Sequence, residues 1–126
     1  MDELERIRNR KKLEILRQLQ EREHGVLDIA SLEEVLQKSR EKLVLVDLWA
    51  PWCMPCRILG PILERLSREM GFVLAKLNTE QHPQEAARLG VQGIPTVLLV
   101  RNGKVVDSFV GVRAIPFIKD IVGRYS

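Results

Sequence analysis

Apolar residues follow two patterns along this chain, one typical of strands and one typical of helices. Short apolar runs that predict strands cover 26–29, 43–49, 72–77, 97–101 and 105–110. The helical spacing of apolar residues predicts helices over 31–39, 53–70, 83–90 and 115–124. Asn102-Gly103, between the last two runs, is typical of a tight hairpin turn. Regular structure is therefore expected from residue 26 to the C-terminus.

Two of the predicted helices carry an apolar face. In the helix over 53–70, one face is formed by Ile58, Leu59, Ile62, Leu63 and Leu66. In the last helix, the residues expected to cover one face of a sheet are Phe117, Ile118, Ile121 and Val122.

The first 24 residues form a separate, charged segment. Residues 2–23 contain no Gly or Pro and are rich in Glu, Arg, Lys, Leu and Gln, which predicts a helix that ends at His24-Gly25. Its broken apolar stripe consists of Leu4, Ile7, Leu13, Ile15, Leu16 and Leu19. This stripe packs on the main domain or on a second copy, or it docks on a particular partner. Acidic residues among its bases disfavour RNA or membrane contact.

Length and charge limit the classes of protein to be considered. A chain of 126 residues fits one domain, here expected over 25–126 with 1–24 as a helical extension. The net charge of +3 is small and the basic residues are dispersed, which excludes the usual footprint of a nucleic-acid binder. No stretch is apolar enough for a signal-peptide core or a membrane span. We therefore expect a cytoplasmic protein with neither nucleic acid nor membrane as partner.

The two cysteines, Cys53 and Cys56, lie where a predicted strand passes into a predicted helix. The free N–H groups and the helix dipole at such a junction stabilise a thiolate, so Cys53 is the expected nucleophile. Cys56 is placed to attack a mixed disulfide on Cys53 and release the partner. No metal site is expected, because zinc needs three or four ligands and neither His24 nor His82 has suitable spacing. His82 is expected to cap a helix or to face solvent.

The segment VLVDLWAPWCMPCRILGPILERL, residues 44–66, resembles the thioredoxin family, and so does Gly93-Ile94-Pro95-Thr96. The resemblance runs from about residue 26 to the C-terminus. It implies an α/β thioredoxin fold with a central mixed sheet of four to five strands flanked by helices. It also implies a protein-disulfide reductase that needs no cofactor, acts on protein disulfides and is reduced again by a thioredoxin-reductase-like electron donor.

The same resemblance implies roles for two charged residues on apolar strands. Asp47 would sit behind the dithiol and accept a proton from Cys56, and burial would raise the pKa of its carboxyl towards neutrality. The alternative is a structural aspartate whose hydrogen bonds are satisfied. Lys76 would be the partner of Asp47, or else a lysine with a buried stem whose amine reaches water.

Substrate contact is implied for residues around the dithiol. They are Trp52, Met54 and Pro55 beside the nucleophile, Gly93, Ile94 and Pro95 in the second motif, and Gly111 near the binding groove. The proline of the second motif is expected to be cis, with the backbone of Ile94 pairing with an extended substrate segment. Trp49 is equally compatible with a core and a functional position.

Met54 departs from the family pattern, in which glycine is usual. Proteins with a Cys-x-x-Cys pair differ in reduction potential by roughly 150 mV, about 7 kcal/mol, so the fold alone does not fix the direction of electron flow. The retained Pro55, without a histidine or tyrosine beside it, favours a reductant. The alternatives are a redox adaptor recruited by its N-terminal helix and a disulfide oxidase or isomerase.

Overall fold

The computed structural model describes residues 3, 10, 12, 26–28 and 32–126. Almost all of the segment 1–24 lies outside the described residues, so the helix predicted there, its stop at His24-Gly25 and its docking role stay predictions. His24 also lies outside them.

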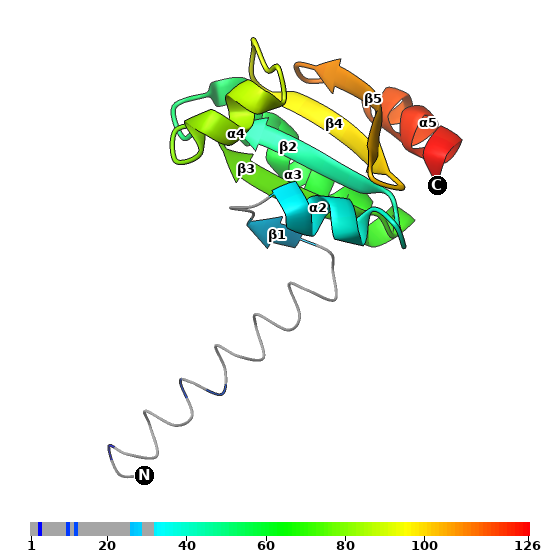
Figure 1. Cartoon of the computed structure of the whole chain (residues 1–126), viewed down its shortest axis with the longest axis horizontal. Helices are drawn as coiled ribbons and strands as arrows, with labels where there is room; N and C mark the ends of the chain where they lie inside the picture. Colours follow the sequence, from blue (N-terminus) through cyan, green and yellow to red (C-terminus); the bar gives the residue numbers. More distant parts are fainter. Residues whose placement is uncertain (1–2, 4–9, 11, 13–25, 29–31) are drawn as a thin grey trace.

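Five strands form one mixed sheet in the order β1-β3-β2-β4-β5 (Figure 1). The strands are β1 Val26–Asp28, β2 Val44–Trp49, β3 Val73–Asn78, β4 Thr96–Arg101 and β5 Lys104–Val110. β3 pairs in parallel with both β1 and β2, whereas β4 is antiparallel to β2 and β5. The expected mixed sheet of four to five strands is confirmed, with boundaries within about two residues of the apolar runs.

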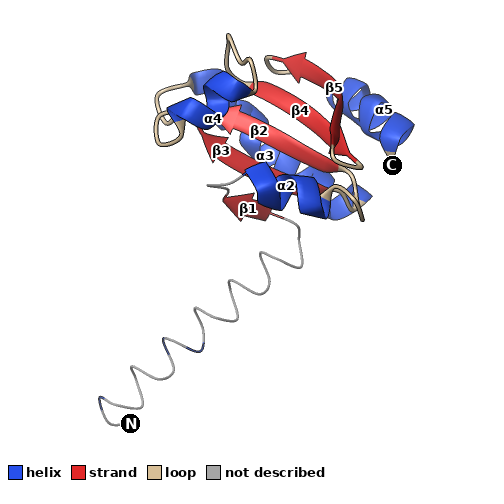
Figure 2. Cartoon of the chain, viewed as in Figure 1, coloured by secondary structure: helices blue, strands red, loops and turns tan. Residues whose placement is uncertain are grey.

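Helices cover both faces of the sheet, which gives three layers (Figure 2). They are α2 Leu32–Lys38, α3 Met54–Met70, α4 Pro83–Arg88 and α5 Ile115–Tyr125. Apolar side chains of α3 and α5 pack on one face of the sheet, and those of α2 and α4 pack on the other. Because side chains alternate along a strand, Leu45 of β2 faces α3 while Val44 and Val46 face the opposite layer. Asp47 and Trp49 therefore share the face of Leu45.

Two residues of the predicted apolar helix faces remain substantially exposed. Ile58 of α3 is 52% exposed, and Phe117 of α5 is 44% exposed. The middle of the α3 face, Leu59, Leu63 and Leu66, is buried, so Ile58 lies at its margin. Phe117 instead meets Phe109 edge to face at 5.9 Å between ring centroids. Periodicity locates the centre of an apolar face better than its edges.

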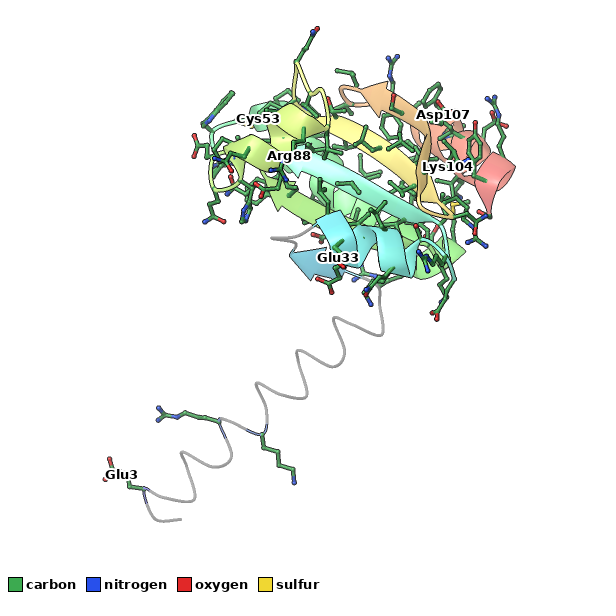
Figure 3. The ribbon with its side chains drawn as sticks, in the orientation of Figure 1. Glu3, Glu33, Cys53, Arg88, Lys104 and Asp107 are labelled. Atoms are coloured by element: carbon green, nitrogen blue, oxygen red, sulfur yellow. A yellow bond between two sulfur atoms is a disulfide. The ribbon has the colours of Figure 1, made fainter. Side chains whose placement is uncertain are left out.

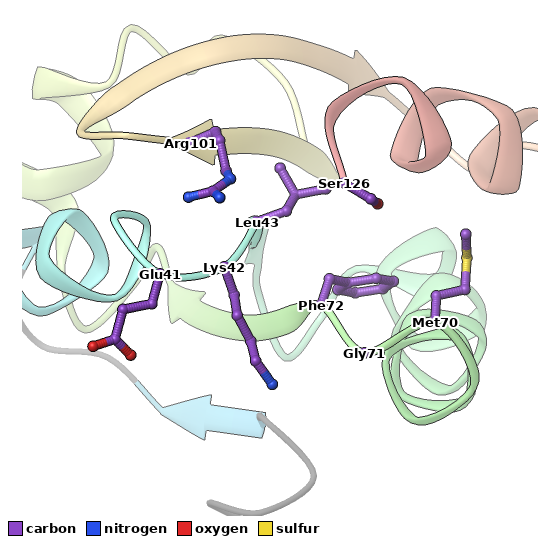
Figure 4. Close-up of a pocket in the computed structure, with 8 residues that line it drawn as sticks. All are labelled: Glu41, Lys42, Leu43, Met70, Gly71, Phe72, Arg101 and Ser126. Atoms are coloured by element: carbon purple, nitrogen blue, oxygen red, sulfur yellow. The ribbon is translucent and has the colours of Figure 1, made fainter.

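The predicted β4–β5 hairpin forms and is tied to the end of α2. Asn102 and Gly103 both have positive φ, 52° and 76°, as the tight turn requires. The Gly103 N–H donates to Ser39 Oγ at 2.9 Å, and Arg101 Nη1 donates to the Ser39 carbonyl at 2.8 Å. A hollow of about 170 Å³ lies beside Arg101 and Leu43 (Figure 4). It marks the end of the sheet where β2 begins.

Candidate active site

The two cysteines lie at the opposite end, where β2 leads into α3. Figure 3 shows Cys53 at the end of the sheet away from Lys104 of the hairpin. Cys53 is the N-cap of α3, with extended backbone, and Cys56 lies in the first turn. The two are joined as a disulfide with their Cα atoms 5.3 Å apart. The Cys56 N–H donates to Cys53 Sγ at 3.3 Å, so the sulfur of Cys53 occupies the position of a capping acceptor.

Both cysteines are 4% exposed and pack with Ala50, while Trp49 and Ile94 contact this cluster from its edge. Trp52 and Met54 beside them are 69% and 63% exposed. The dithiol therefore lies just under the surface with apolar side chains around it.

The second motif reaches the dithiol through the register of β2 and β4. Leu48 pairs with Thr96, so the turn before β4 lies beside the end of β2. The Ile94–Pro95 peptide is cis, as expected. The Gly111 N–H donates to the Pro95 carbonyl at 2.9 Å, and Gly111 has a φ of 80° that favours glycine.

Gly93 lies in the same region. Its carbonyl accepts a hydrogen bond from the Thr96 hydroxyl, and a side chain at position 93 would approach Val110 at 4.0 Å. The structure thus gathers all the residues expected at the binding groove at this end of the sheet.

Asp47 is 1% exposed, and its Oδ1 atom has no hydrogen-bond partner. Burial raises the pKa of the Asp47 carboxyl from 3.8 to about 6. The charge of Lys76 opposes this rise, and the charge of Glu64 adds to it. A structural aspartate with satisfied hydrogen bonds does not fit this geometry, whereas an acid that changes protonation near neutral pH does.

Lys76 lies directly across from Asp47 in the β2–β3 register. Its amine, however, forms an ion pair with Glu64 of α3, and no hydrogen bond to Asp47 is found among the described residues. Lys76 thus lies beside Asp47, as the family resemblance implies, and its charge lowers the pKa of that carboxyl, but its ion pair is made with Glu64. The lysine acts on Asp47 through its charge, and its close partner is Glu64.

Sequence reasoning missed Glu64, although a signal was available. Glu64 follows Leu63 on α3, at the margin of the buried face, and comes four residues after Gly60. A side chain at position 60 would lie 3.5 Å from Lys76 Nζ, so the lysine amine reaches α3 at Gly60. Glycine at that point leaves room for the lysine amine beside the helix.

Two other candidates have minor positions. His82 is the N-cap of α4 and is half-buried, but its side chain makes no capping hydrogen bond. Trp49 is partly buried, and its Nε1 atom has no partner. The part of the chain that the structure describes contains no group of three or more residues able to hold a metal ion. None of its helices is long and apolar enough to cross a membrane.

Comparison with known proteins gives consistent results. The sequence model of the thioredoxin family matches residues 24–123. A thioredoxin of Bacillus subtilis is 36% identical over 90 residues, which is 70% of this chain and 86% of that protein. A thioredoxin of Chlorobaculum thiosulfatiphilum is 48% identical over 73 residues, covering 56% of this chain and 68% of that protein.

Solved structures agree with this likeness. A mutant thioredoxin of Halobacterium salinarum superposes with a TM-score of 0.76 at 29% identity, over 82% of this chain and 92% of that one. Fasciola hepatica thioredoxin gives a TM-score of 0.72 at 32% identity, over 80% and 98% of the two chains.

Proposed function

The chain belongs to the thioredoxin family and is a thiol-disulfide oxidoreductase, and on this premise we propose a role for each residue of the Cys53–Cys56 site. The observation that supports these roles best is that Cys53 Sγ caps α3 and accepts the Cys56 N–H. A negative sulfur at that position gains from the N–H donor and from the helix dipole. Cys53 is therefore the nucleophile, and the pair reduces protein disulfides.

In the first step, the Cys53 thiolate attacks one sulfur of a client disulfide. A bond forms between Cys53 Sγ and that sulfur, the client S–S bond breaks, and the other client sulfur leaves as a thiolate that takes up a proton.

In the second step, the Cys56 thiol gives its proton to Asp47, and the resulting thiolate attacks Cys53 Sγ. The Cys53–Cys56 disulfide forms, the bond between Cys53 Sγ and the client sulfur breaks, and that sulfur leaves as a thiolate that takes up a proton, while Asp47 releases the proton it accepted. The client gains two electrons and two protons, and the enzyme is oxidised. Asp47 suits this role because it is buried without a hydrogen bond at Oδ1, and because burial places its pKa at about 6.

Client recognition in this proposal uses the turn before β4. Ile94 contacts the cysteine cluster, and its backbone makes no hydrogen bond to other described residues. An extended client segment pairs with this backbone while Trp52, Met54 and Pro55 contact the residues next to its disulfide. Gly93 and Gly111, which flank Pro95, place no side chain in the path of a client main chain.

The proposal also gives the direction of electron transfer and the compartment in which the protein acts. A cytoplasmic dithiol pool keeps such a pair reduced, so the protein transfers electrons from a thioredoxin-reductase-like donor to protein disulfides. Residues 25–126 form the catalytic domain in this scheme, in line with the family match from residue 24. Residues 1–24 serve for self-association or for docking a partner.

Insulin-disulfide reduction with dithiothreitol as the electron source tests the roles of the two thiols. Cys53→Ser is expected to abolish turnover. Cys56→Ser is expected to accumulate a mixed disulfide with the client, visible as an adduct by mass spectrometry. Full turnover by Cys53→Ser, or an adduct on Cys56 in the wild-type chain, contradicts the assignment. A reduction potential near that of a strong oxidant such as DsbA, about −120 mV, contradicts the direction.

A further inference from the structure

Three ionisable side chains, Asp47, Lys76 and Glu64, lie near one another where α3 packs on the sheet. Asp47 and Lys76 are neighbours on β2 and β3, on the face of the sheet that α3 covers. Glu64 comes from α3 itself and holds the Lys76 amine in an ion pair. Two carboxyl groups therefore lie near one ammonium group, which pairs with only one of them.

Lys76 pairs with the more exposed of the two carboxylates. The side chain of Glu64 is 37% exposed and that of Lys76 is 20% exposed, whereas Asp47 is 1% exposed. Asp47 Oδ1 keeps no hydrogen-bond partner even though the lysine is its register neighbour. The ion pair with Glu64 thus leaves the buried acid without a close counter-ion.

No other charge in the described layers replaces the lysine. On the β4 side, Asp47 faces Val97, which packs in the same apolar cluster as Ile118 of α5. From α3, the charged group that acts on Asp47 is Glu64, and the two cysteines are joined as a disulfide. The state of Asp47 is therefore set by burial, by Lys76 and by Glu64.

We propose that Glu64 is a positioning residue which, by engaging the Lys76 ammonium, keeps that cation from pairing with Asp47 and so preserves Asp47 as the proton acceptor for Cys56. This inference rests on the proposed function. An aspartate paired closely with an ammonium is a weak base, because the cation stabilises the carboxylate that would have to take up the proton. Glu64 prevents that pairing without touching the reacting sulfurs.

Carboxyl ¹³C NMR of the oxidised protein gives a direct test, because the disulfide-bonded cysteines do not titrate there. The Asp47 signal is assigned with Asp47→Asn. In Glu64→Gln, the Asp47 midpoint is expected to fall by roughly one pH unit, because an anion is lost and Lys76 is released. In Lys76→Met, it is expected to rise by roughly one unit. These opposite shifts are not produced by a general loss of stability.

Glu69→Gln is the matched control. Glu69 lies on the same helix and pairs with Arg65 at 3.0 Å and Lys119 at 3.9 Å, away from Asp47. Its removal is expected to leave the Asp47 midpoint unchanged. Glu64→Asp retains the charge and is expected to fall between wild type and Glu64→Gln.

The pH dependence of mixed-disulfide resolution provides the second measurement. The part of the pH–rate profile that reflects ionisation of Asp47 is expected to move to lower pH in Glu64→Gln and to higher pH in Lys76→Met. An unchanged or raised Asp47 midpoint in Glu64→Gln overturns the role of Glu64, while turnover that still depends on Cys53 leaves the proposed function intact. Conversely, if the wild-type chain does not reduce client disulfides, the proposed function fails whatever the NMR shows.

Discussion

The two ends of the sheet treat buried polar groups in opposite ways. At the hairpin end, Ser39 is fully buried, yet its hydroxyl donates to the Leu36 carbonyl and accepts the Gly103 N–H. At the dithiol end, Asp47 Oδ1 and Trp49 Nε1 are buried without partners. A buried polar group without a hydrogen bond lowers the free energy of unfolding. The hairpin end therefore stabilises the fold, whereas the dithiol end destabilises it in part.

Asp47 gives the largest expected effect. The folded carboxyl has a pKa of about 6 against an ordinary 3.8, so folding holds a proton that the unfolded chain releases between these values. The contribution of the Asp47 carboxyl to the free energy of unfolding is therefore greatest below about pH 4. It falls by roughly 3 kcal/mol as the pH rises through about 6. Asp47→Asn is expected to remove this loss in urea unfolding measured from pH 4 to 8, while disulfide reduction slows.

A wild-type stability curve that is flat over the same pH range, or one that rises, contradicts the cost assigned to the buried acid at the dithiol end. Asp107→Asn serves as the control, because Asp107 lies on β5 and accepts from Tyr125, far from the cysteines.

Ser39→Ala is the corresponding change at the satisfied end. It leaves the Gly103 N–H and the end of α2 without their shared partner, which is expected to cost about 1 to 3 kcal/mol. Urea unfolding measures the loss, and insulin reduction well below the unfolding midpoint is expected to be unchanged. A fall in turnover equal to that of Asp47→Asn removes the distinction between the two ends.

Gly103→Ala tests the hairpin itself. Gly103 has a φ of 76° with open space where a side chain would lie, so the cost is conformational and about 1 kcal/mol. Thermal unfolding is expected to shift down by about 4 °C, with no change in activity. Gly123→Ala, inside α5 and also in open space, is the control and is expected to be neutral or stabilising.

Glu69→Gln has the smallest expected effect. Its ion pairs with Arg65 and Lys119 are exposed, and such pairs contribute about 0 to 1 kcal/mol. Added salt is expected to weaken the difference between wild type and variant further. If Glu69→Gln lowers the free energy of unfolding by more than about 1 kcal/mol, these exposed ion pairs stabilise the fold as much as the buried hydrogen bonds at the hairpin end do.

Particular residues show what the sequence can predict here. Apolar runs place β2 to within one residue, and Asn102-Gly103 predicts the hairpin, because both signals are local. The position of Cys53 at the start of α3 was predicted from local signals as well, because an apolar strand pattern precedes it and a helical pattern follows it. The cis Ile94–Pro95 peptide came from family resemblance.

The features that the sequence does not predict are those that depend on packing between elements. The partner of Lys76 depends on how α3 crosses β3, so Glu64 was not found from the strand pattern. Ile58 and Phe117 lie at the margins of helix faces, and their exposure depends on how far neighbouring elements extend.

The short spacing of the Cys53–Cys56 bond has one more consequence. The bond joins residues only three positions apart in sequence. In the chain-entropy model, a disulfide that closes so short a loop adds about 2 kcal/mol to the free energy of unfolding, less than one that closes a longer loop. The core clusters of the sheet lie outside this loop. The Cys53–Cys56 disulfide can therefore be reduced and formed again in every catalytic cycle without unfolding of the domain.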